Sequence, residues 1–264
     1  GRTAYPTEGR ALPRVLWMTP YLPCVGRHGG AGRMYHLLKR IAKSYHVTLL
    51  SFIEDAEEKQ FLPELESMCE KVVAMPRIPP RRWQVFPYEP FSEFFTPAME
   101  QALEDCLAER DFDLIQLEYT QMACYARKAF GIPTLMTMYE VDSAACSRRA
   151  RVESNPLLKV RWFYNYLQVL DRECALLGRV DAAICVTDVD MRELRKFCTC
   201  VPIHVISTGV DSDYFRPPEQ PANGSRLVFV GAFRHEPNVD AMRYFCKKVL
   251  PLVQAQVPET ELYI

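Results

Sequence analysis

The fold is decided by residues 14–52, RVLWMTPYLPCVGRHGGAGRMYHLLKRIAKSYHVTLLSF. Two apolar stretches within them, Arg14–Thr19 and His46–Phe52, are typical of buried strands. A strand, a crossover helix and a second apolar strand form the β-α-β unit of a parallel sheet. Between the two strands lie a loop rich in proline and glycine and a predicted helix over 31–44, whose apolar side chains recur at helical spacing: Met34, Leu37, Leu38 and Ile41.

The same alternation continues to residue 206. Apolar strands that alternate with helices are typical of a doubly wound parallel sheet with helices on both faces. The chain therefore predicts an α/β, Rossmann-like sheet of about seven strands. Its further elements are a charged helix or pair of short helices over 54–70, strands over 71–75, 114–118, 133–138, 182–187 and 203–206, and helices over 97–109, 121–130, 156–177 and 189–197.

One stretch, residues 76–97, interrupts the alternation. It holds six prolines and six aromatic side chains, and this proline density excludes a long regular helix. The aromatic residues predict either a loop packed onto the domain or a surface that faces a partner.

A second domain begins near the end of the chain. Residues 215–225, FRPPEQPANGS, have the composition of an interdomain linker. We place the N-terminal Rossmann-like domain at 11–216 and the start of a second, truncated domain at 217–264. This second part is predicted to contain strands over 226–230 and 261–264 and a helix over 238–257. We expect its apolar residues to favour self-association into a homo-oligomer: Leu227, Phe229, Phe245, Val249, Leu250, Val253, Leu262 and Ile264.

Composition argues against several classes of protein. A formal net charge of −1 argues against a general nucleic-acid-binding protein, whose surface would be strongly basic. No apolar run approaches the roughly 20 residues of a membrane-spanning helix, and the first residues lack the apolar core of a signal peptide. The ten cysteines include no CxxC pair, which predicts reduced, structural thiols in a cytoplasmic protein.

Three predicted loops follow the carboxyl ends of strands, where open α/β sheets bind their ligands. Gly29 and Gly30 precede the first helix, and backbone amides at a helix N-terminus bind phosphate or another anion. Residues 118–120 and 139–140 follow two later strands. The alternatives are a flexible turn for the glycines and helix caps for the carboxylates. Because the glycine loop lacks the G-x-G-x-x-G pattern, NAD binding is disfavoured.

Three further segments carry a family resemblance. They are residues 161–197 (RWFYNYLQVLDRECALLGRVDAAICVTDVDMRELRKF), 206–217 (ISTGVDSDYFRP) and 227–264 (LVFVGAFRHEPNVDAMRYFCKKVLPLVQAQVPETELYI). Together with the glycine-rich helix start, they resemble family 4 retaining glycosyltransferases of the GT-B fold, in which two Rossmann-like domains face each other across a cleft. The likeness is greatest to the branch associated with bacterial exopolysaccharide and exosortase systems.

The resemblance implies a function for the intact enzyme. It implies transfer of a sugar from a nucleotide-sugar donor to a glycan or lipid-linked acceptor in polysaccharide biosynthesis, without a metal or other cofactor. It also implies a cytoplasmic enzyme and leaves peripheral contact with the inner membrane open. The residues it assigns are Tyr139 and Glu140 to catalysis, Gly29, Gly30 and Arg234 to the donor diphosphate, and Glu118, Tyr119, Thr120 and Arg33 to the acceptor.

Several residues depart from the family pattern. Tyr139 stands where the family usually has histidine, and Thr208 stands where it has asparagine. Ala232 and Pro237 occupy the positions of an arginine and a lysine that many members use for the diphosphate, and the E-x(7)-E segment would lie beyond Ile264. We therefore expect this chain alone to be inactive. A non-catalytic domain that binds an acceptor or a partner is the rival hypothesis.

Overall fold

The computed structural model describes residues 12–77, 94–213, 215–217, 224–233 and 236–264. The chain divides into two compact units, Gly1–Gly209 (unit 1) and Val210–Ile264 (unit 2). The domain boundary expected at residue 216 stays a prediction.

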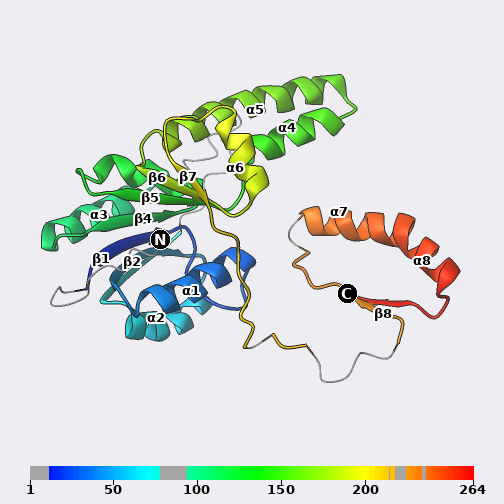
Figure 1. Cartoon of the computed structure of the whole chain (residues 1–264), viewed down its shortest axis with the longest axis horizontal. Helices are drawn as coiled ribbons and strands as arrows, with labels where there is room; N and C mark the ends of the chain where they lie inside the picture. Colours follow the sequence, from blue (N-terminus) through cyan, green and yellow to red (C-terminus); the bar gives the residue numbers. More distant parts are fainter. Residues whose placement is uncertain (1–11, 78–93, 214, 218–223, 234–235) are drawn as a thin grey trace, which may run out of the picture. The chain divides into compact units, whose positions relative to one another are not determined.

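Unit 1 is built on a seven-stranded sheet in which every strand runs parallel to its neighbours. The strand order is β3-β2-β1-β4-β5-β6-β7 (Figure 1). β1 lies between β2 and β4, so that Trp17 pairs with Leu49 on one side and Gln116 on the other. This topology confirms the predicted Rossmann-like parallel sheet. The strands are β1 (Arg14–Thr19), β2 (His46–Ile53), β3 (Lys71–Pro76), β4 (Leu114–Glu118), β5 (Thr134–Met138), β6 (Ala182–Cys185) and β7 (Ile203–Val205).

Capping residues explain where two long helices of unit 1 begin. Thr96 accepts a hydrogen bond from the backbone N–H of Met99 at 3.1 Å, and Pro97 occupies the first turn. Asn155 and Pro156 start a second helix in the same way. In chain order the helical segments are α1 (Gly29–Ile41), the 3-10 helix η1 (Ala56–Phe61), α2 (Leu62–Met68), α3 (Pro97–Glu109), the 3-10 helix η2 (Thr120–Lys128), α4 (Asp142–Val152), α5 (Pro156–Leu177) and α6 (Asp188–Arg195).

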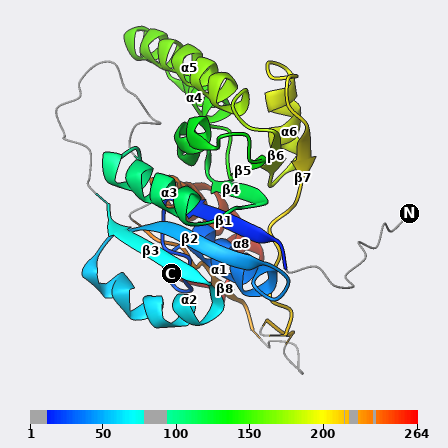
Figure 2. The ribbon, with the colours of Figure 1, turned by 90° about the vertical axis from the view of Figure 1, so that its left-hand side faces the viewer.

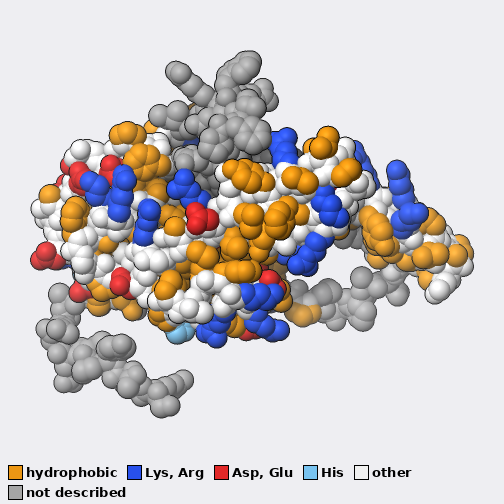
Figure 3. Space-filling view, turned by 90° about the horizontal axis from the view of Figure 1, so that it is seen from above, with side chains coloured by type: hydrophobic (Ala, Val, Ile, Leu, Met, Phe, Trp, Pro, Cys, Tyr) orange, Lys and Arg blue, Asp and Glu red, His pale blue; other side chains and the backbone are white. Residues whose placement is uncertain are grey.

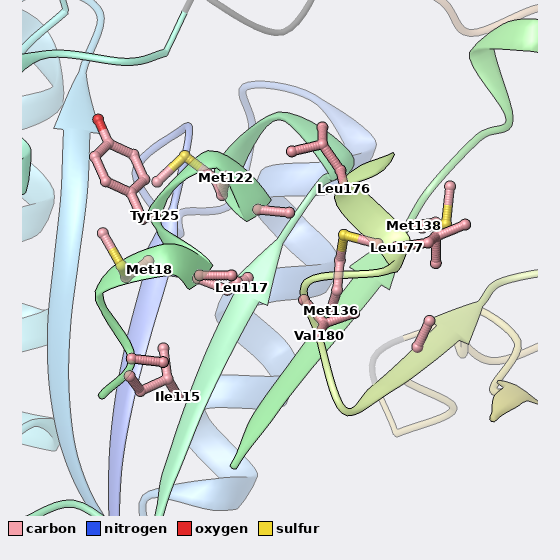
Figure 4. Packing of buried hydrophobic residues seen from close by; sticks show 14 of the residues in the cluster. Met18, Ile115, Leu117, Met122, Tyr125, Met136, Met138, Leu176, Leu177 and Val180 are labelled. Atoms are coloured by element: carbon pink, nitrogen blue, oxygen red, sulfur yellow. The ribbon is translucent and has the colours of Figure 1, made fainter. Parts of the chain in front are cut away.

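Helices cover both faces of the sheet (Figure 2). Leu16 and Met18 of β1 are fully buried in the larger core, which also holds side chains of α3, η2 and α5. Trp17, between them in sequence, is buried on the opposite face against residues of α1 and α2. Figure 4 shows part of the larger core around Leu117 and Met136. Burial on both faces explains why the strands are almost continuously apolar.

Two helical segments of unit 1 differ from the sequence-based prediction. No helix is predicted over 142–152, where α4 lies. Its N-cap residue, Val141, supplies no side-chain hydrogen bond. Instead, the Glu173 carboxylate of α5 accepts hydrogen bonds from the N–H groups of Asp142 at 2.7 Å and Ser143 at 3.3 Å. The second segment is η2, a 3-10 helix that begins at Thr120 where an α-helix over 121–130 is predicted.

Most of the proline-rich stretch, residues 78–93, lies outside the described residues. Of its six aromatic residues, the described ones are Phe94 and Phe95. Phe94 is buried, with its ring centroid 5.4 Å from that of Tyr21, and Phe95 stacks on Tyr125. These two residues pack onto unit 1, as the first of the two predicted alternatives requires. Within the described part of the chain, no helix is long and apolar enough to cross a membrane. The ten cysteines are present as free thiols.

Unit 2 contains a parallel pair of strands, β8 (Arg226–Val228) and β9 (Glu261–Tyr263), joined by a helical run. That run consists of α7 (Glu236–Tyr244), a π-helical turn (Phe245–Val249) and α8 (Leu250–Gln256). The sequence predicts one continuous helix here. Pro251 accounts for the difference, because it lacks an N–H group and its ring cannot follow a regular α-helical turn.

Candidate functional site

Polar and aromatic side chains gather at the carboxyl ends of β4 and β5. Glu118 is the last residue of β4, and Tyr139 directly follows β5. Arg33 reaches this edge from α1, the helix that follows β1. The structure brings these three predicted site residues together with Tyr119, although they come from separate parts of the sequence.

Glu118 forms the buried base of this cluster. Its carboxylate accepts hydrogen bonds from Trp17 Nε1 at 3.1 Å, Gln116 Nε2 at 3.0 Å and the Tyr139 hydroxyl at 2.9 Å. Burial raises the pKa of Glu118, and these donors and the nearby Arg33 oppose the increase. Because its side chain is buried and has internal partners, Glu118 is placed to orient Tyr139 rather than to contact an acceptor directly.

Tyr119 and Tyr139 form a stacked pair above Glu118. Their ring centroids lie 4.1 Å apart and their planes differ by 5°. Tyr119 has a backbone φ of 66°, a left-handed conformation that is unusual for a bulky residue and places its ring against Tyr139. Burial raises the pKa of both hydroxyls above that of ordinary tyrosine, so both phenols are neutral at pH 7. Both rings are half-buried, and each keeps some exposed surface.

Arg33 joins the cluster to the chain that follows β7. Its Nη2 donates to the backbone carbonyl of Ile206 at 3.1 Å, and its Nη1 lies 3.5 Å from the Tyr139 hydroxyl. The guanidinium carbon is 5.2 Å from the centroid of the Tyr139 ring. Arg33 is itself buried, and it thereby fixes the start of the S-T-G-V-D segment relative to α1.

Close packing within unit 1 explains why position 30 is a glycine. A Cβ atom at this position would lie 1.9 Å from the Tyr119 hydroxyl oxygen, which is closer than any real contact. A Cβ at Gly29 would meet nothing within 4 Å. His28 caps α1, since its Nδ1 accepts from the Ala31 N–H at 3.3 Å, and the amides of Gly29 and Gly30 have no acceptor within the helix. These amides keep the geometry of an anion site, and their predicted role at a diphosphate stays a prediction.

The remaining predicted residues lie in different settings. Thr120 is buried at the start of η2, where its side chain cannot reach a ligand without a local rearrangement. Glu140 is exposed directly after Tyr139. Arg234 lies outside the described residues. Thr208, which stands where the family usually has asparagine, is exposed in the segment after β7.

An aromatic row beside the cluster was not predicted from the sequence. Tyr21 lies edge-on to three rings, with centroids 4.7 Å from His28, 5.4 Å from Phe94 and 5.5 Å from Tyr119. The Arg77 guanidinium lies over the Phe94 ring, with 4.5 Å between its central carbon and the centroid. Arg77 directly follows β3 and Tyr21 lies two residues beyond the end of β1, so their position at strand ends is the signal that identifies them.

The arrangement supplies a rigid aromatic surface rather than a charged catalytic group. Tyr119 and Tyr139 form a stacked aromatic pair that is partly exposed, and the Tyr139 hydroxyl is held by Glu118. Among the residues that the structure describes, no group of three or more His, Cys, Asp or Glu side chains is arranged to hold a metal ion.

Several solved structures share the fold of this chain. Sucrose-phosphate synthase from Thermosynechococcus elongatus matches with a TM-score of 0.62 and 18% identity, over 95% of this chain and 61% of that one. Anabaena Alr3699/HepE in complex with UDP and glucose has a TM-score of 0.54 and 14% identity, over 87% and 57% of the two chains. Medicago truncatula UGT71G1, complexed with UDP-glucose, has a TM-score of 0.51 and 11% identity, over 84% and 60%.

These matches show the fold, which is that of the N-terminal half of GT-B enzymes. The chain spans about three fifths of the length of each of these proteins. No curated protein matches it significantly in sequence. The model of Glycosyltransferase Family 4, however, matches residues 28–214, which is more than half of the chain and includes the cluster around Glu118 and Tyr139. The chain belongs to Glycosyltransferase Family 4.

Proposed function

We propose that the intact enzyme transfers a sugar, with retention of anomeric configuration, from a nucleotide-sugar donor to a glycan or lipid-linked acceptor in polysaccharide biosynthesis. The observation that carries this proposal is the stacked Tyr119–Tyr139 pair on buried Glu118, inside the segment that matches the family. It lies at the sheet edge where α/β folds bind ligands. The reaction would take place in the cytoplasm.

In this proposal the residues of unit 1 bind and orient the substrates. The amides of Gly29 and Gly30 face the donor diphosphate, whose negative charge they stabilise as it leaves. The exposed part of the stacked Tyr119–Tyr139 pair contacts the sugar ring of the donor or acceptor. Glu118 and Arg33 fix the position of Tyr139 from below. Glu140, exposed beside Tyr139, is the carboxylate that can reach a substrate hydroxyl.

We further propose that the 264-residue chain alone does not transfer sugar. The described residues of unit 2 form a two-stranded sheet with one helical run, which offers few contacts to a nucleotide. Titration calorimetry of this chain with UDP- and GDP-sugars should show no binding in the micromolar range. Micromolar binding, or turnover by this chain, would contradict this part of the proposal.

The activity itself is tested in the full-length enzyme. We expect NMR of the product to show the anomeric configuration of the donor, and we expect Tyr139→Phe to lower kcat/KM on the order of tenfold, because the variant lacks the hydroxyl that Glu118 orients. Tyr45→Phe, a half-exposed tyrosine after α1, is the matched control and should leave the rate unchanged. An inverted product would refute retention, and an unaltered rate in Tyr139→Phe would refute the role of Tyr139.

One observation supports a non-catalytic alternative. The family usually has histidine where this chain has Tyr139, and a neutral phenol whose pKa is raised by burial is a poor proton acceptor at pH 7. Under this alternative unit 1 binds a glycan or partner without chemistry. Measuring glycan binding and sugar transfer by the same full-length protein distinguishes the two functions. A binding domain would bind glycan and show no turnover with any nucleotide sugar.

A further inference from the structure

The first half of α5 lies outside the core of unit 1. The buried residues of this helix, from Val169 to Leu177, all belong to its second half. Between Pro156 and Gln168 no side chain is buried. α4 and α5 run side by side beyond the sheet (Figure 1). We call residues 147–164, which comprise the end of α4, the link between the helices and the first turns of α5, the α4–α5 tip.

An apolar stripe runs along the outer face of α5. Leu157, Val160, Tyr164 and Leu167 follow one another at i, i+3, i+7 and i+10, so they lie on one side of the helix, and Phe163 lies beside them. Their exposed fractions are 81%, 68%, 50% and 46%, with 55% for Phe163. This helical spacing places the stripe opposite buried Val169 and Glu173. A contiguous exposed apolar surface of this kind indicates a binding surface.

The tip also concentrates positive charge. It carries five cationic side chains, Arg148, Arg149, Arg151, Lys159 and Arg161, and one carboxylate, Glu153, whereas the whole chain has a net charge of −1. The Glu153 carboxylate already has a partner, because it accepts a hydrogen bond from the backbone N–H of Asn155 at 3.0 Å. Figure 3 shows hydrophobic side chains gathered on this face with lysine and arginine side chains beside them.

Two of the cations stand at a hollow between α4 and α5. The hollow has a volume of about 610 Å³, and Arg151 and Lys159 line it together with the apolar side chains of Val160, Phe163 and Tyr166. Among the described residues, no carboxylate forms an ion pair with Arg151 or Lys159. The hollow therefore presents two available positive charges above an apolar wall, which suits a ligand with an anionic head and an apolar body.

We propose that the α4–α5 tip docks onto the surface of an anionic lipid bilayer. Arg151 and Lys159 contact lipid phosphates, while Leu157, Val160 and Phe163 enter the boundary between headgroups and acyl chains. The charge distribution selects this occupant over a second copy of the chain, because a symmetric contact would place five cations against five cations. The surface is separate from the Glu118–Tyr139 cluster, and the inference does not depend on the sugar chemistry.

Vesicle flotation with the purified chain tests this inference. The probes are neutral phosphatidylcholine vesicles and vesicles that also contain about 30 mol% phosphatidylglycerol. We expect binding on the order of tenfold tighter to the anionic vesicles, and a decrease when the salt concentration is raised. Arg151→Gln/Lys159→Gln should weaken anionic-vesicle binding on the order of tenfold. Val160→Ser/Phe163→Ser should weaken it by a similar factor, because these residues supply the apolar contact.

Matched variants outside the tip serve as controls. Lys43→Gln/Arg192→Gln removes two exposed cations of unit 1, and Phe130→Ser removes a side chain that is 73% exposed. Both should bind anionic vesicles as the unmodified chain does, and circular dichroism verifies that every variant is folded. Equal binding to neutral vesicles, no binding to either, or an equal loss in the controls would overturn the inference. Light scattering that shows an oligomer abolished by the tip variants, without vesicle binding, would assign the surface to a protein contact instead.

Discussion

The two units of this chain form the same β-α-β motif but bury it to different extents. In β1 of unit 1, Val15, Leu16, Trp17 and Met18 are each at most 5% exposed. In unit 2, Leu227 of β8 is half-buried, whereas its neighbour Val228 is 72% exposed and Val230, which lies just beyond β8, is 91% exposed. A β-α-β unit acquires its second buried face only from neighbouring elements. Among the described residues, unit 1 has these neighbours and unit 2 does not.

The largest expected difference between the units is in the pH dependence of stability. Glu173, fully buried in unit 1, has its pKa raised by burial from 4.5 to about 7. The folded state therefore binds the proton more tightly than the unfolded state, and the corresponding stability is present below pH 4.5 and is lost as the pH rises through 7. Its full value is about 3 kcal/mol, from about 1.4 kcal/mol per pKa unit. Urea unfolding between pH 5 and 8 measures it.

Two variants isolate this contribution. Glu173→Gln keeps an oxygen acceptor for the Asp142 and Ser143 amides and cannot ionise, so it should flatten the decline in stability toward pH 8. Glu259→Gln, an exposed carboxylate of unit 2, should leave the decline unchanged. Burial also raises the pKa of Asp142, to about 6, so this residue lowers stability in the same direction as the pH rises. Glu173→Gln should therefore keep a smaller decline in stability with pH than the unmodified chain shows. An identical slope in all three proteins would show that Glu173 is not protonated in the folded state.

A second, smaller contrast concerns glycine substitutions. Gly30→Ala places a Cβ 1.9 Å from the hydroxyl of Tyr119, whose ring is stacked on Tyr139 and edge-on to Tyr21, so it cannot move away freely. We expect a loss of about 2 kcal/mol in the free energy of unfolding. In unit 2, a Cβ at Gly231 would meet the Phe229 ring at 2.8 Å, but that ring is half-exposed and has room to rotate.

Thermal unfolding compares these substitutions directly. Gly231→Ala should change stability by less than about 0.5 kcal/mol. Gly29→Ala is the matched control within α1, since its Cβ would meet nothing within 4 Å, and should be neutral or slightly stabilising because alanine favours the helix. A neutral Gly30→Ala would mean that the Tyr119–Tyr139 stack adjusts easily, and its proposed role as a rigid surface would fail.

The sequence was sufficient for the sheet of unit 1 because most strand residues are apolar and each strand is short and separated from the next by helical or turn residues. β1, β4 and the long helix α5 have the predicted bounds. α4 was missed because its sequence, DSAACSRRARV, has few apolar residues and no capping side chain of its own. Its cap is Glu173, 31 residues away, and no local pattern reveals such a contact.

The candidate site was predictable in position but not in its contacts. Counting to the carboxyl ends of strands identifies Glu118 and Tyr139 correctly as neighbours at one edge. The sequence does not reveal that Trp17, 101 residues earlier, donates to Glu118 and helps to bury it. Nor does it reveal that Gly30 accommodates Tyr119, because this close approach depends on the left-handed backbone at Tyr119. Roles that rest on three-dimensional packing therefore require the structure.

The smallest expected effect is on self-association through unit 2. Val228 and Tyr263 pair across the β8–β9 sheet and share a face, where they are 72% and 48% exposed, and Val230, just beyond β8, is 91% exposed. A second copy could cover this face, since two-fold contacts are the commonest way to bury a self-complementary patch. We expect light scattering over a concentration series to show a weak oligomer. Val230→Ser should weaken its association by about 1 kcal/mol, or roughly fivefold in Kd, because the valine would no longer be removed from water.

Two controls decide whether unit 2 mediates this association. Val189→Ser, in α6 of unit 1, changes a valine that is 61% exposed and should leave the oligomer unaffected. Deletion of residues 222–264 should give a monomer, since unit 1 buries both faces of its own sheet. A strict monomer at high concentration, unchanged by the deletion, would rule out self-association. If the deletion variant still associates, unit 1 supplies the contact, and the exposed face of β8 and β9 would then be free for elements other than a second copy of this chain.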